Sequence, residues 1–361
     1  MSSEFGRKLK IQIFGQSHSE AIGVVIDNFP CGIKVDIEKI QSFMQRRTPG
    51  NDLLSTQRKE PDKIEIISGV YNGYTCGAPI CAIIANTNTK STDYSEIADK
   101  PRPSHADFAA HQKYNGFNDV RGGGHFSGRL TAPLCFAGAL CMQYLEQLEI
   151  YVGAHISCIG KVKDNQFDSV NLTKEHLLIA QGKSFPALCD EAAELMKKEI
   201  LIAKERGDSI GGAIECAVVG LPVGLGGGMF GGVENILSSA MFSIPAVKGI
   251  EFGSGFEGCL KHGSEYNDEY YYDRSGLIKA YSNNNGGITG GMTNGMPLLF
   301  RVAIKPTPSV FIEQKTVSFK EKKDTTLVIK GRHDPCILKR AIPAVEAVCA
   351  FAITDIILYN E

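Results

Sequence analysis

The sequence RGGGHFSGR, residues 121–129, places three consecutive glycines between two arginines. A simple turn needs one glycine, whereas three in a row let the backbone approach a group that any Cβ would push away. Arg121 and Arg129 add rigid forks of N–H donors that suit phosphate or carboxylate. We interpret these residues, called the glycine loop below, as a ligand-binding segment; the alternative is a flexible surface loop.

On both sides of the glycine loop, short apolar runs and longer amphipathic ones predict the secondary structure. Residues 131–148 are rich in Ala and Leu and predict a buried helix, whose N-terminus beside the loop would favour an anion. Further helices are expected at 37–47, with Asp36 as N-cap, and at 235–246 and 341–358. The helix at 235–246 is expected to end at Pro245 or in the segment just before it. Strands are expected at 11–14, 22–27, 63–70, 78–85, 211–219 and 298–304. Asn72-Gly73 is a turn signal between the strands at 63–70 and 78–85.

The order of these elements favours an α+β fold. Strands and helices come in two sets, without the regular alternation that is typical of a doubly wound sheet. The segment of about 161–206 has few glycines and many charges, with helical spacing at 189–204, so we expect a peripheral helical insertion there. Because no Pro- or Ser-rich linker divides the chain, we predict a single domain over residues 1–361.

Composition argues against several classes of partner. The 361 residues are 43% apolar and 22% charged, and the net charge of −2 gives no global field to recruit nucleic acid or an anionic membrane. The 11 cysteines include no C-x-x-C pair, which argues against a zinc site and suits the reduced thiols of a cytoplasmic protein. Residues 1–10 are polar, and the apolar run 344–359 is short and carries carboxylates. We therefore expect no metal site, signal peptide or membrane span.

Two histidines outside the glycine loop are candidates for proton transfer. His18 lies in a turn of small polar residues between two strands, where it would face a cleft or solvent and could act as a general acid. His105 lies between Arg102 and Asp107, and a nearby aspartate holds a histidine in one tautomer. The alternatives are a surface turn for His18 and, for His105, a helix cap at Ser104 with incidental neighbours.

Three further segments could bind an anion or a cofactor. Residues 283–291 are rich in Asn and Gly but lack the spacing of a dinucleotide-binding loop, and the chain has no P-loop pattern. Residues 305–309 (KPTPS) form a rigid segment with a cation and hydroxyls that suits a phosphate. Arg332, His333 and Asp334 combine a cation with a carboxylate that could relay a proton, or they form a surface ion pair before a helix.

Taken together, these segments resemble the chorismate synthase family from about Gly15 to about Asp355. The matching stretches are FGQSH (14–18), RRTPG (46–50), SGV (68–70), RPSHAD (102–107), RGGG (121–124), GDSIGG (207–212), AVKG (246–249), KPT (305–307) and GRHDPC (331–336). The resemblance implies a β-α-β sandwich, with two antiparallel sheets between and around helices in one large domain. It also implies a cytoplasmic homotetramer.

The activity implied by this resemblance is conversion of 5-enolpyruvylshikimate 3-phosphate to chorismate and phosphate, the last step of the shikimate pathway. The enzyme would be a lyase that performs an anti-1,4-elimination and needs reduced FMN without net redox change. By resemblance, His18 protonates the departing phosphate, His105 protonates or neutralises the flavin, and Asp334 assists proton removal through flavin N5.

The same resemblance implies the binding residues. Arg47, Arg102 and Arg129 would bind the phosphate and two carboxylates of the substrate, and these arginines and Arg332 are also candidates for the FMN phosphate. Flavin contacts are expected at His125, Phe126, Ser127, Pro245, Ala246, Gly290, Lys305, Pro306, Thr307, Pro308, Ser309 and Arg332.

The chain departs from the family pattern at four positions. His125 and Phe126 stand where most members have Arg and Ser, and Leu130 replaces a usual Glu. These changes affect the side-chain contacts to FMN and leave the backbone contacts. Leu53 stands where many members place a second arginine associated with NADPH. We therefore expect that the protein does not reduce its own flavin and depends on an external reductant, such as a flavin reductase, or on photoreduction.

Two other classes of function stay open at this point. A flavoprotein oxidoreductase that takes hydride from a nicotinamide would explain the glycine-rich segments but not the paired histidines or the surplus of arginines. A non-enzymatic module that binds a phosphorylated ligand would need none of His18, His105 and Asp334. Replacing each histidine by alanine separates the classes, because only the lyase would lose turnover while it keeps FMN.

Overall fold

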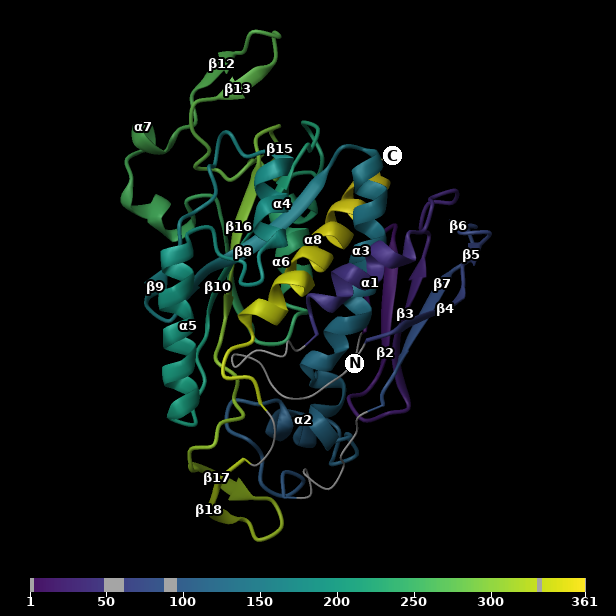
Figure 1. Cartoon of the computed structure of the whole chain (residues 1–361), viewed down its shortest axis with the longest axis vertical. Helices are drawn as coiled ribbons and strands as arrows, with labels where there is room; N and C mark the ends of the chain where they lie inside the picture. Colours follow the sequence, from purple (N-terminus) through teal and green to yellow (C-terminus); the bar gives the residue numbers. More distant parts are fainter. Residues whose placement is uncertain (1–2, 49–61, 88–95, 330–332, 361) are drawn as a thin grey trace.

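Two five-stranded antiparallel sheets face each other across a layer of helices (Figure 1). The computed structural model describes residues 3–48, 62–87, 96–329 and 333–360. The first sheet has the order β1 (Glu4–Phe5), β2 (Lys10–Gly15), β3 (Ala21–Asp27), β7 (Ile80–Ala85), β4 (Ile64–Ser68). The second has the order β11 (Val247–Phe252), β16 (Leu298–Ile304), β10 (Gly212–Val219), β8 (Tyr151–Ile159), β9 (Val162–Lys163).

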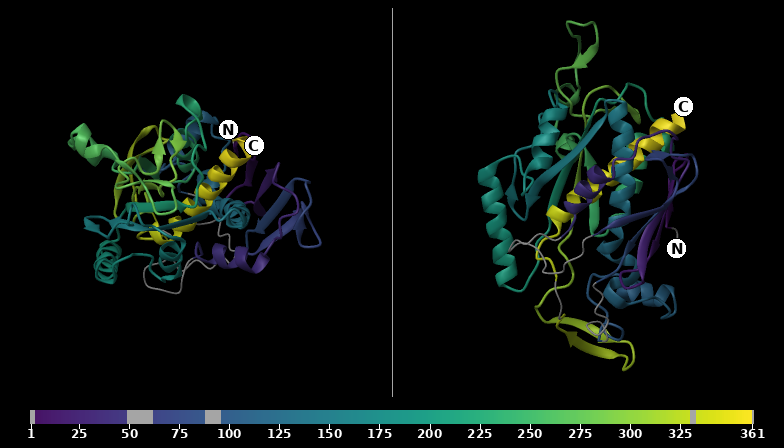
Figure 2. Two further views of the ribbon diagram at one scale, coloured as in Figure 1. Left: turned by 90° about the horizontal axis from the view of Figure 1, so that it is seen from above. Right: turned by 45° about the vertical axis from the view of Figure 1, so that its right-hand side comes forward.

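The layer between the sheets is made of α3 (Thr131–Gln147) and α8 (Leu338–Asn360). α3 packs against β3 and β7 of the first sheet, α8 packs against β8 and β10 of the second, and the two helices pack against each other (Figure 2). A Cβ on Gly138 of α3 would lie 2.2 Å from the Cα of Ala347 in α8, so only glycine permits this close crossing. The arrangement confirms the β-α-β sandwich.

Shorter elements surround this frame. α1 (Ile37–Gln45) packs on α3, and its N-cap Asp36 accepts a hydrogen bond from the backbone N–H of Lys39 at 2.9 Å, as predicted. α6 (Val233–Met241) packs on α8. Two short helices are α2 (Asp107–Lys113) and α7 (Gly263–Tyr266). Small two-stranded hairpins are formed by β5 (Val70–Tyr71) with β6 (Tyr74–Thr75), β12 (Tyr270–Tyr272) with β13 (Ile278–Ala280), β14 (Ile288–Thr289) with β15 (Met292–Thr293), and β17 (Gln314–Ser318) with β18 (Lys323–Leu327).

The segment 161–206 contains β9, α4 (Lys174–Gly182) and α5 (Asp190–Glu205). Leu177 of α4 packs in one apolar cluster with Ala217 and Val219 of β10. Cys216 and Val218, which alternate with them, belong to the core around α8. Since successive residues of a strand point to opposite faces, α4 covers the outer face of the second sheet.

α8 is long and apolar enough to cross a membrane by length and composition alone, but its apolar window is wholly buried in the protein. Two carboxylates in it are also buried and have partners. Asp355 accepts hydrogen bonds from the backbone N–H groups of residues 7–9 at 2.8–3.1 Å. Glu346 pairs with Arg46 and accepts the N–H of Ala154 at 2.9 Å. These contacts identify α8 as the core helix of the sandwich.

The helix expected at 235–246 is α6, which begins at Val233 and ends at Met241, in the segment just before Pro245. Pro245 disfavours a helical conformation at the preceding residue and cannot donate the hydrogen bond that would continue the helix. The predicted Asn72-Gly73 turn exists, but it closes the small β5–β6 hairpin between the two longer strands.

Candidate active site

A cavity of about 570 Å³ opens at the end of the sandwich where α8 begins. Its size is within the usual range of small-molecule sites. The wall is formed by the glycine loop, by residues 102–106, 242–246 and 305–309, and by the chain from His333 into the first turns of α8. Five distant parts of the sequence, each glycine- or proline-containing, therefore meet in one place.

Two glycines of the glycine loop make room for two histidines. A Cβ at Gly122 would lie 2.5 Å from Cε1 of His18, and one at Gly123 would lie 3.1 Å from Cε1 of His105. Both glycines have positive φ angles, 60° and 85°, that side chains other than glycine rarely adopt. The loop thus brings two histidines from distant segments onto successive residues of its backbone.

His105 belongs to a buried charge cluster. Its Nδ1 lies 2.6 Å from Oδ1 of Asp107, and Asp107 also accepts hydrogen bonds from Nε (2.7 Å) and Nη2 (2.9 Å) of Arg102. Burial alone would raise the pKa of Asp107, but the hydrogen bonds from Arg102 and His105 hold that pKa well below its usual range. Asp107 is therefore ionised, and its carboxylate accepts a hydrogen bond from the Nδ1–H of His105. This leaves Nε2 of His105 for chemistry.

A second buried cluster joins two arginines through one carboxylate. Arg47 and Arg129 both pair with Asp62, whose side chain is fully buried. Burial alone would raise the pKa of Asp62, but the two guanidinium groups outweigh it and lower that pKa. Because Asp62 neutralises one of the two charges, the pair offers a net single positive charge to the cavity.

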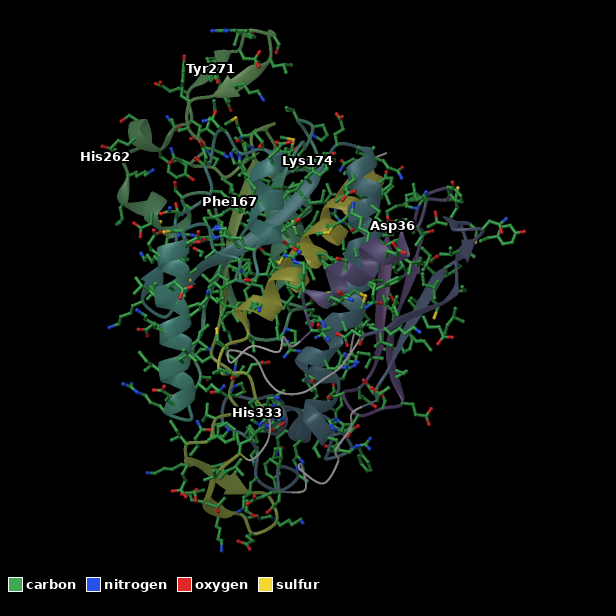
Figure 3. The ribbon with its side chains drawn as sticks, in the orientation of Figure 1. Asp36, Phe167, Lys174, His262, Tyr271 and His333 are labelled. Atoms are coloured by element: carbon green, nitrogen blue, oxygen red, sulfur yellow. The ribbon has the colours of Figure 1, made fainter. Side chains whose placement is uncertain are left out.

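A third cluster lies at the start of α8. Asp334 pairs with Arg340, whose Nε donates to the backbone oxygen of Arg47 at 2.9 Å. His333, labelled in Figure 3, lies at the lower end of the sandwich. Burial, reinforced by Arg102, lowers its pKa to about 4, so its ring is neutral at pH 7. In the part of the chain that the structure describes, the buried Nε2 of His333 has no hydrogen-bond partner.

The chain is similar to known proteins over nearly its whole length. The family model described as chorismate synthase matches residues 9–358. The chain is 46% identical over 358 residues to a chorismate synthase of Pyrococcus abyssi, covering 99% of this chain and 98% of that protein. It is 42% identical to one of Cytophaga hutchinsonii, covering 100% and 99% of the two chains. This chain belongs to the chorismate synthase family.

A solved chorismate synthase crystal structure gives the same result for the fold. It superposes with a TM-score of 0.77 at 27% identity and covers 99% of this chain and 93% of that one. The protein is accordingly a lyase that converts 5-enolpyruvylshikimate 3-phosphate to chorismate and phosphate by anti-1,4-elimination. The chorismate synthase reaction requires reduced FMN and belongs to aromatic amino acid biosynthesis.

Most residues that the family resemblance singled out lie on the cavity wall. Those lining it are Arg47, Arg102, His105, His125, Phe126, Ser127, Arg129, Pro245, Ala246, Lys305, Thr307, Pro308, Ser309 and Asp334. His18, expected to face a cleft or solvent, is instead buried against Gly122 and does not line the wall. Pro306 is not among the lining residues although its neighbours are. Gly290 lies in the turn of the β14–β15 hairpin, away from this wall. Leu53 and Arg332 lie outside the described residues.

The residues of the wall fit FMN, the cofactor of the chorismate synthase reaction, which has a phosphate and a flat ring. Cations are supplied by Arg47, Arg102, Arg129, Lys305 and Arg340, and apolar surface by Phe126, Ile244, Pro245, Ile337 and Ala341. Burial and the neighbouring Lys248 lower the pKa of Lys305, whose Nζ donates to the carbonyl oxygen of Ser104 at 2.6 Å. A bound anion near Lys305 would reverse part of that shift.

His125 stands where most family members have arginine, and both of its ring nitrogens already have protein partners. Nδ1 lies 2.8 Å from the carbonyl oxygen of Gly15, and Nε2 lies 2.9 Å from Oγ of Ser3. A carbonyl oxygen can only accept, so Nδ1 carries the proton and Nε2 of the neutral ring accepts from the hydroxyl. The ring of His125 therefore supports the turn that carries His18, and its backbone remains available to a flavin.

Three site residues were missed by sequence reasoning. Asp62 gave no signal, because only the fold shows that it lies between Arg47 and Arg129. Arg340 lies inside the predicted closing helix, where a single cation reads as an ordinary helix residue. His333 was quoted beside Arg332 and Asp334, but the burial of its Nε2 could not be foreseen.

Proposed function

We propose that His18, His105 and Asp334 carry the proton chemistry of the chorismate synthase reaction in this protein. One observation supports this most: the glycine loop holds both histidines at its backbone, at the edge of a cavity surrounded by arginines and lysine. We also propose that Arg47, Arg102 and Arg129 bind the phosphate and carboxylates of the substrate.

Each residue has a role that its contacts suit. His18 donates a proton to the departing phosphate. His105, fixed through Nδ1 by Asp107, presents Nε2 to the flavin ring and adjusts its charge. Asp334, held by Arg340, accepts the proton that leaves. Reduced FMN, when bound, would supply the electron density that lets phosphate leave and would accept the hydrogen lost from C6, without net redox change.

The flavin would be held by the glycine loop and by the segments facing it. The contacts that we assign to it are His125, Phe126, Ser127, Pro245, Ala246, Gly290, Lys305, Pro306, Thr307, Pro308, Ser309 and Arg332. At residue 125 the backbone serves, since the ring is engaged with Gly15 and Ser3. At residue 126 a half-exposed phenyl ring offers apolar surface to the flavin.

We further propose that a second copy of the chain completes the site in a homotetramer. Gly290 is the one assigned flavin contact in the described ranges that lies in a separate hairpin. Around that hairpin the surface is apolar: Val223, Met229 and Phe230 are 74%, 85% and 89% exposed. Gly291 contacts Gly227 and Gly232, which places the hairpin beside this surface. Phe230→Asp would then dissociate the tetramer and weaken FMN binding, whereas Ile179→Asp on α4 would leave both unchanged in sedimentation and flavin titration.

The remaining proposals concern supply and place. An external reductant, such as a flavin reductase, would provide reduced FMN, and the enzyme would act in the cytoplasm as a single domain of residues 1–361 with a helical insertion at about 161–206. Turnover supported by NADPH alone, with purified protein and no added reductase, would contradict the need for an external reductant.

The deciding experiment is anaerobic turnover. Purified protein, dithionite-reduced FMN and 5-enolpyruvylshikimate 3-phosphate are mixed, and chorismate absorbance and phosphate release are followed together. We expect equal amounts of both products, and none with oxidised FMN. His18→Ala and His105→Ala should each retain FMN binding and lose about 10²- to 10⁴-fold in turnover. Either variant turning over like the wild type would remove that histidine from the mechanism.

A further inference from the structure

Asn86 lies at the junction between the turn that carries His18 and the arginine cluster. It directly follows β7 and is half-buried, and it is not part of the cavity wall. Its Nδ2 donates to the carbonyl oxygens of Gln16 at 3.1 Å and of Ser19 at 2.8 Å, on either side of His18. Its Oδ1 accepts from Nε of Arg129 at 3.1 Å.

Only a primary amide has the set of groups that this position uses. The two carbonyl oxygens can accept but not donate, and the guanidinium can donate but not accept. A carboxylate of the same shape would keep the contact with Arg129 and would face two carbonyl oxygens without a proton to offer them. The backbone N–H of Asn86 also donates to the carbonyl oxygen of Glu20 at 2.9 Å, which fixes where the side chain starts.

We propose that Asn86 is a positioning residue that sets the placement of the His18 ring relative to the Arg129 guanidinium, so that both act on one substrate molecule. The inference rests on the proposed roles of His18 and Arg129. It concerns geometry, since misplacing a reacting group by about 1 Å can cost about 10²-fold in rate.

Other contacts keep both groups in the site when Asn86 is changed. Arg129 is also paired with Asp62. The His18 turn is also held by the backbone N–H of Ser17, which donates to the carbonyl oxygen of Gly124 at 3.0 Å. Loss of the amide would therefore shift the two groups without releasing them, and the rate would change more than the fold.

The test compares Asn86→Asp with Asn86→Leu in anaerobic assays at saturating reduced FMN. Asn86→Asp keeps the acceptor for Arg129 and loses both donors to the His18 turn. We expect kcat to fall about 10- to 100-fold and the KM for 5-enolpyruvylshikimate 3-phosphate to stay within about twofold. Asn86→Leu loses the acceptor for Arg129 as well as the two donors to the His18 turn. Its kcat should fall as far as that of Asn86→Asp, and its KM should rise as well.

Asn28→Asp is a matched control. Asn28 lies at the opposite end of β3, and its Nδ2 also donates to a backbone oxygen, that of Lys8 at 3.1 Å. This variant should keep the kcat and KM of the wild type. Thermal midpoint and FMN affinity are measured for all variants, because a general structural role of Asn86 would lower these together with kcat and KM.

Three outcomes would overturn the inference: kcat of Asn86→Asp within twofold of the wild type, equal effects of Asn86→Asp on kcat and KM, or a drop in thermal midpoint that accounts for the lost activity. His18→Ala is assayed in parallel. If it retains turnover, the proposed role of His18 has failed. If it loses turnover while Asn86→Asp does not, the inference on Asn86 alone has failed.

Discussion

Two histidine–carboxylate clusters in this protein have the same chemistry and different access to the cavity. His105 with Asp107 lines the cavity, and its side chain is 16% exposed. His155 lies on β8 in the second sheet and is completely buried between Asp164 and Glu215. Its Nε2 lies 2.7 Å from Glu215 and its Nδ1 lies 3.2 Å from Asp164.

The difference lies in how many ring nitrogens the protein occupies. At His105 one nitrogen is held by Asp107 and the other is left for a ligand. At His155 carboxylates take both. Asp164 and Glu215 in turn accept backbone N–H groups of Cys189 and Phe167 at 2.9 Å, so the cluster fastens the 161–206 segment to the sheet. We therefore expect the cluster of His105 and Asp107 to serve catalysis and the cluster of His155 to serve stability.

The largest expected effect is the loss of catalysis when the cluster of His105 and Asp107 is changed. His105→Ala should lower kcat by about 10²- to 10⁴-fold and leave the thermal midpoint nearly unchanged, because the side chain fills no core position. Steady-state assays with reduced FMN and differential scanning fluorimetry measure the two quantities. A large drop in thermal midpoint with kcat preserved would reverse the roles assigned to the two clusters.

The cluster of His155, Asp164 and Glu215 should show the opposite pattern, a loss of stability with little loss of catalysis. His155→Ala leaves two buried carboxylates without their partner and should lower the free energy of unfolding by about 3–5 kcal/mol. The kcat per folded molecule should stay within about threefold. Equilibrium denaturation in urea measures the loss, and His262→Ala, at an exposed helix cap, should cost about 1 kcal/mol or less. Equal losses of unfolding free energy in the two variants would show that the His155 cluster stabilises the fold no more than an exposed helix cap does.

The pH dependence of stability sharpens the comparison further. Burial alone would lower the pKa of His155, but Asp164 and Glu215 raise it above its usual value of 6.5. The folded protein thus holds this proton more tightly than the unfolded chain. The stabilisation is fully present below pH 6.5 and is lost as the pH rises through the raised pKa of the folded state.

We expect the unfolding free energy of the wild type to approach that of His155→Gln as the pH is raised from 6 to 9. Glutamine keeps hydrogen-bonding capacity and cannot titrate, so it isolates the contribution of the proton. Each tenfold difference in proton affinity between the folded and unfolded states corresponds to about 1.4 kcal/mol. A gap between the two proteins that stays constant over this range would mean that the pKa of His155 is the same in the folded and unfolded states.

Sequence reasoning found the elements better than the contacts. The strands β2, β3, β10 and β16 and the helices α1 and α3 were predicted because apolar periodicity and the Asp36 cap are local signals. The end of α6 was predicted only as Pro245 or the segment just before it, because a proline's effect begins upstream of the proline. That Asn72-Gly73 closes a hairpin of its own could not be seen from a turn signal alone.

The site divides in the same way. Residues inside the quoted motifs, such as His105 and Ser127, do line the cavity. Asp62, Asn86 and Arg340 act through partners far away in sequence, and a lone Asp, Asn or Arg carries no signal of its partner. The cluster of His155 gave no signal either, because only the fold brings carboxylates to both of its ring nitrogens.

The smallest expected effect is at His125, which lines the cavity without a carboxylate. His125→Gln places an amide donor near the carbonyl oxygen of Gly15 and should change kcat and FMN affinity by less than about threefold, because one net hydrogen bond is worth about 0.5–1.5 kcal/mol. Flavin titration and steady-state assays measure both. A much larger loss of FMN affinity would show that the ring of His125 itself binds the flavin. In that case the contacts with Ser3 and Gly15 must break when the cofactor enters, and the ring of His125 would be available to a ligand as well as that of His105.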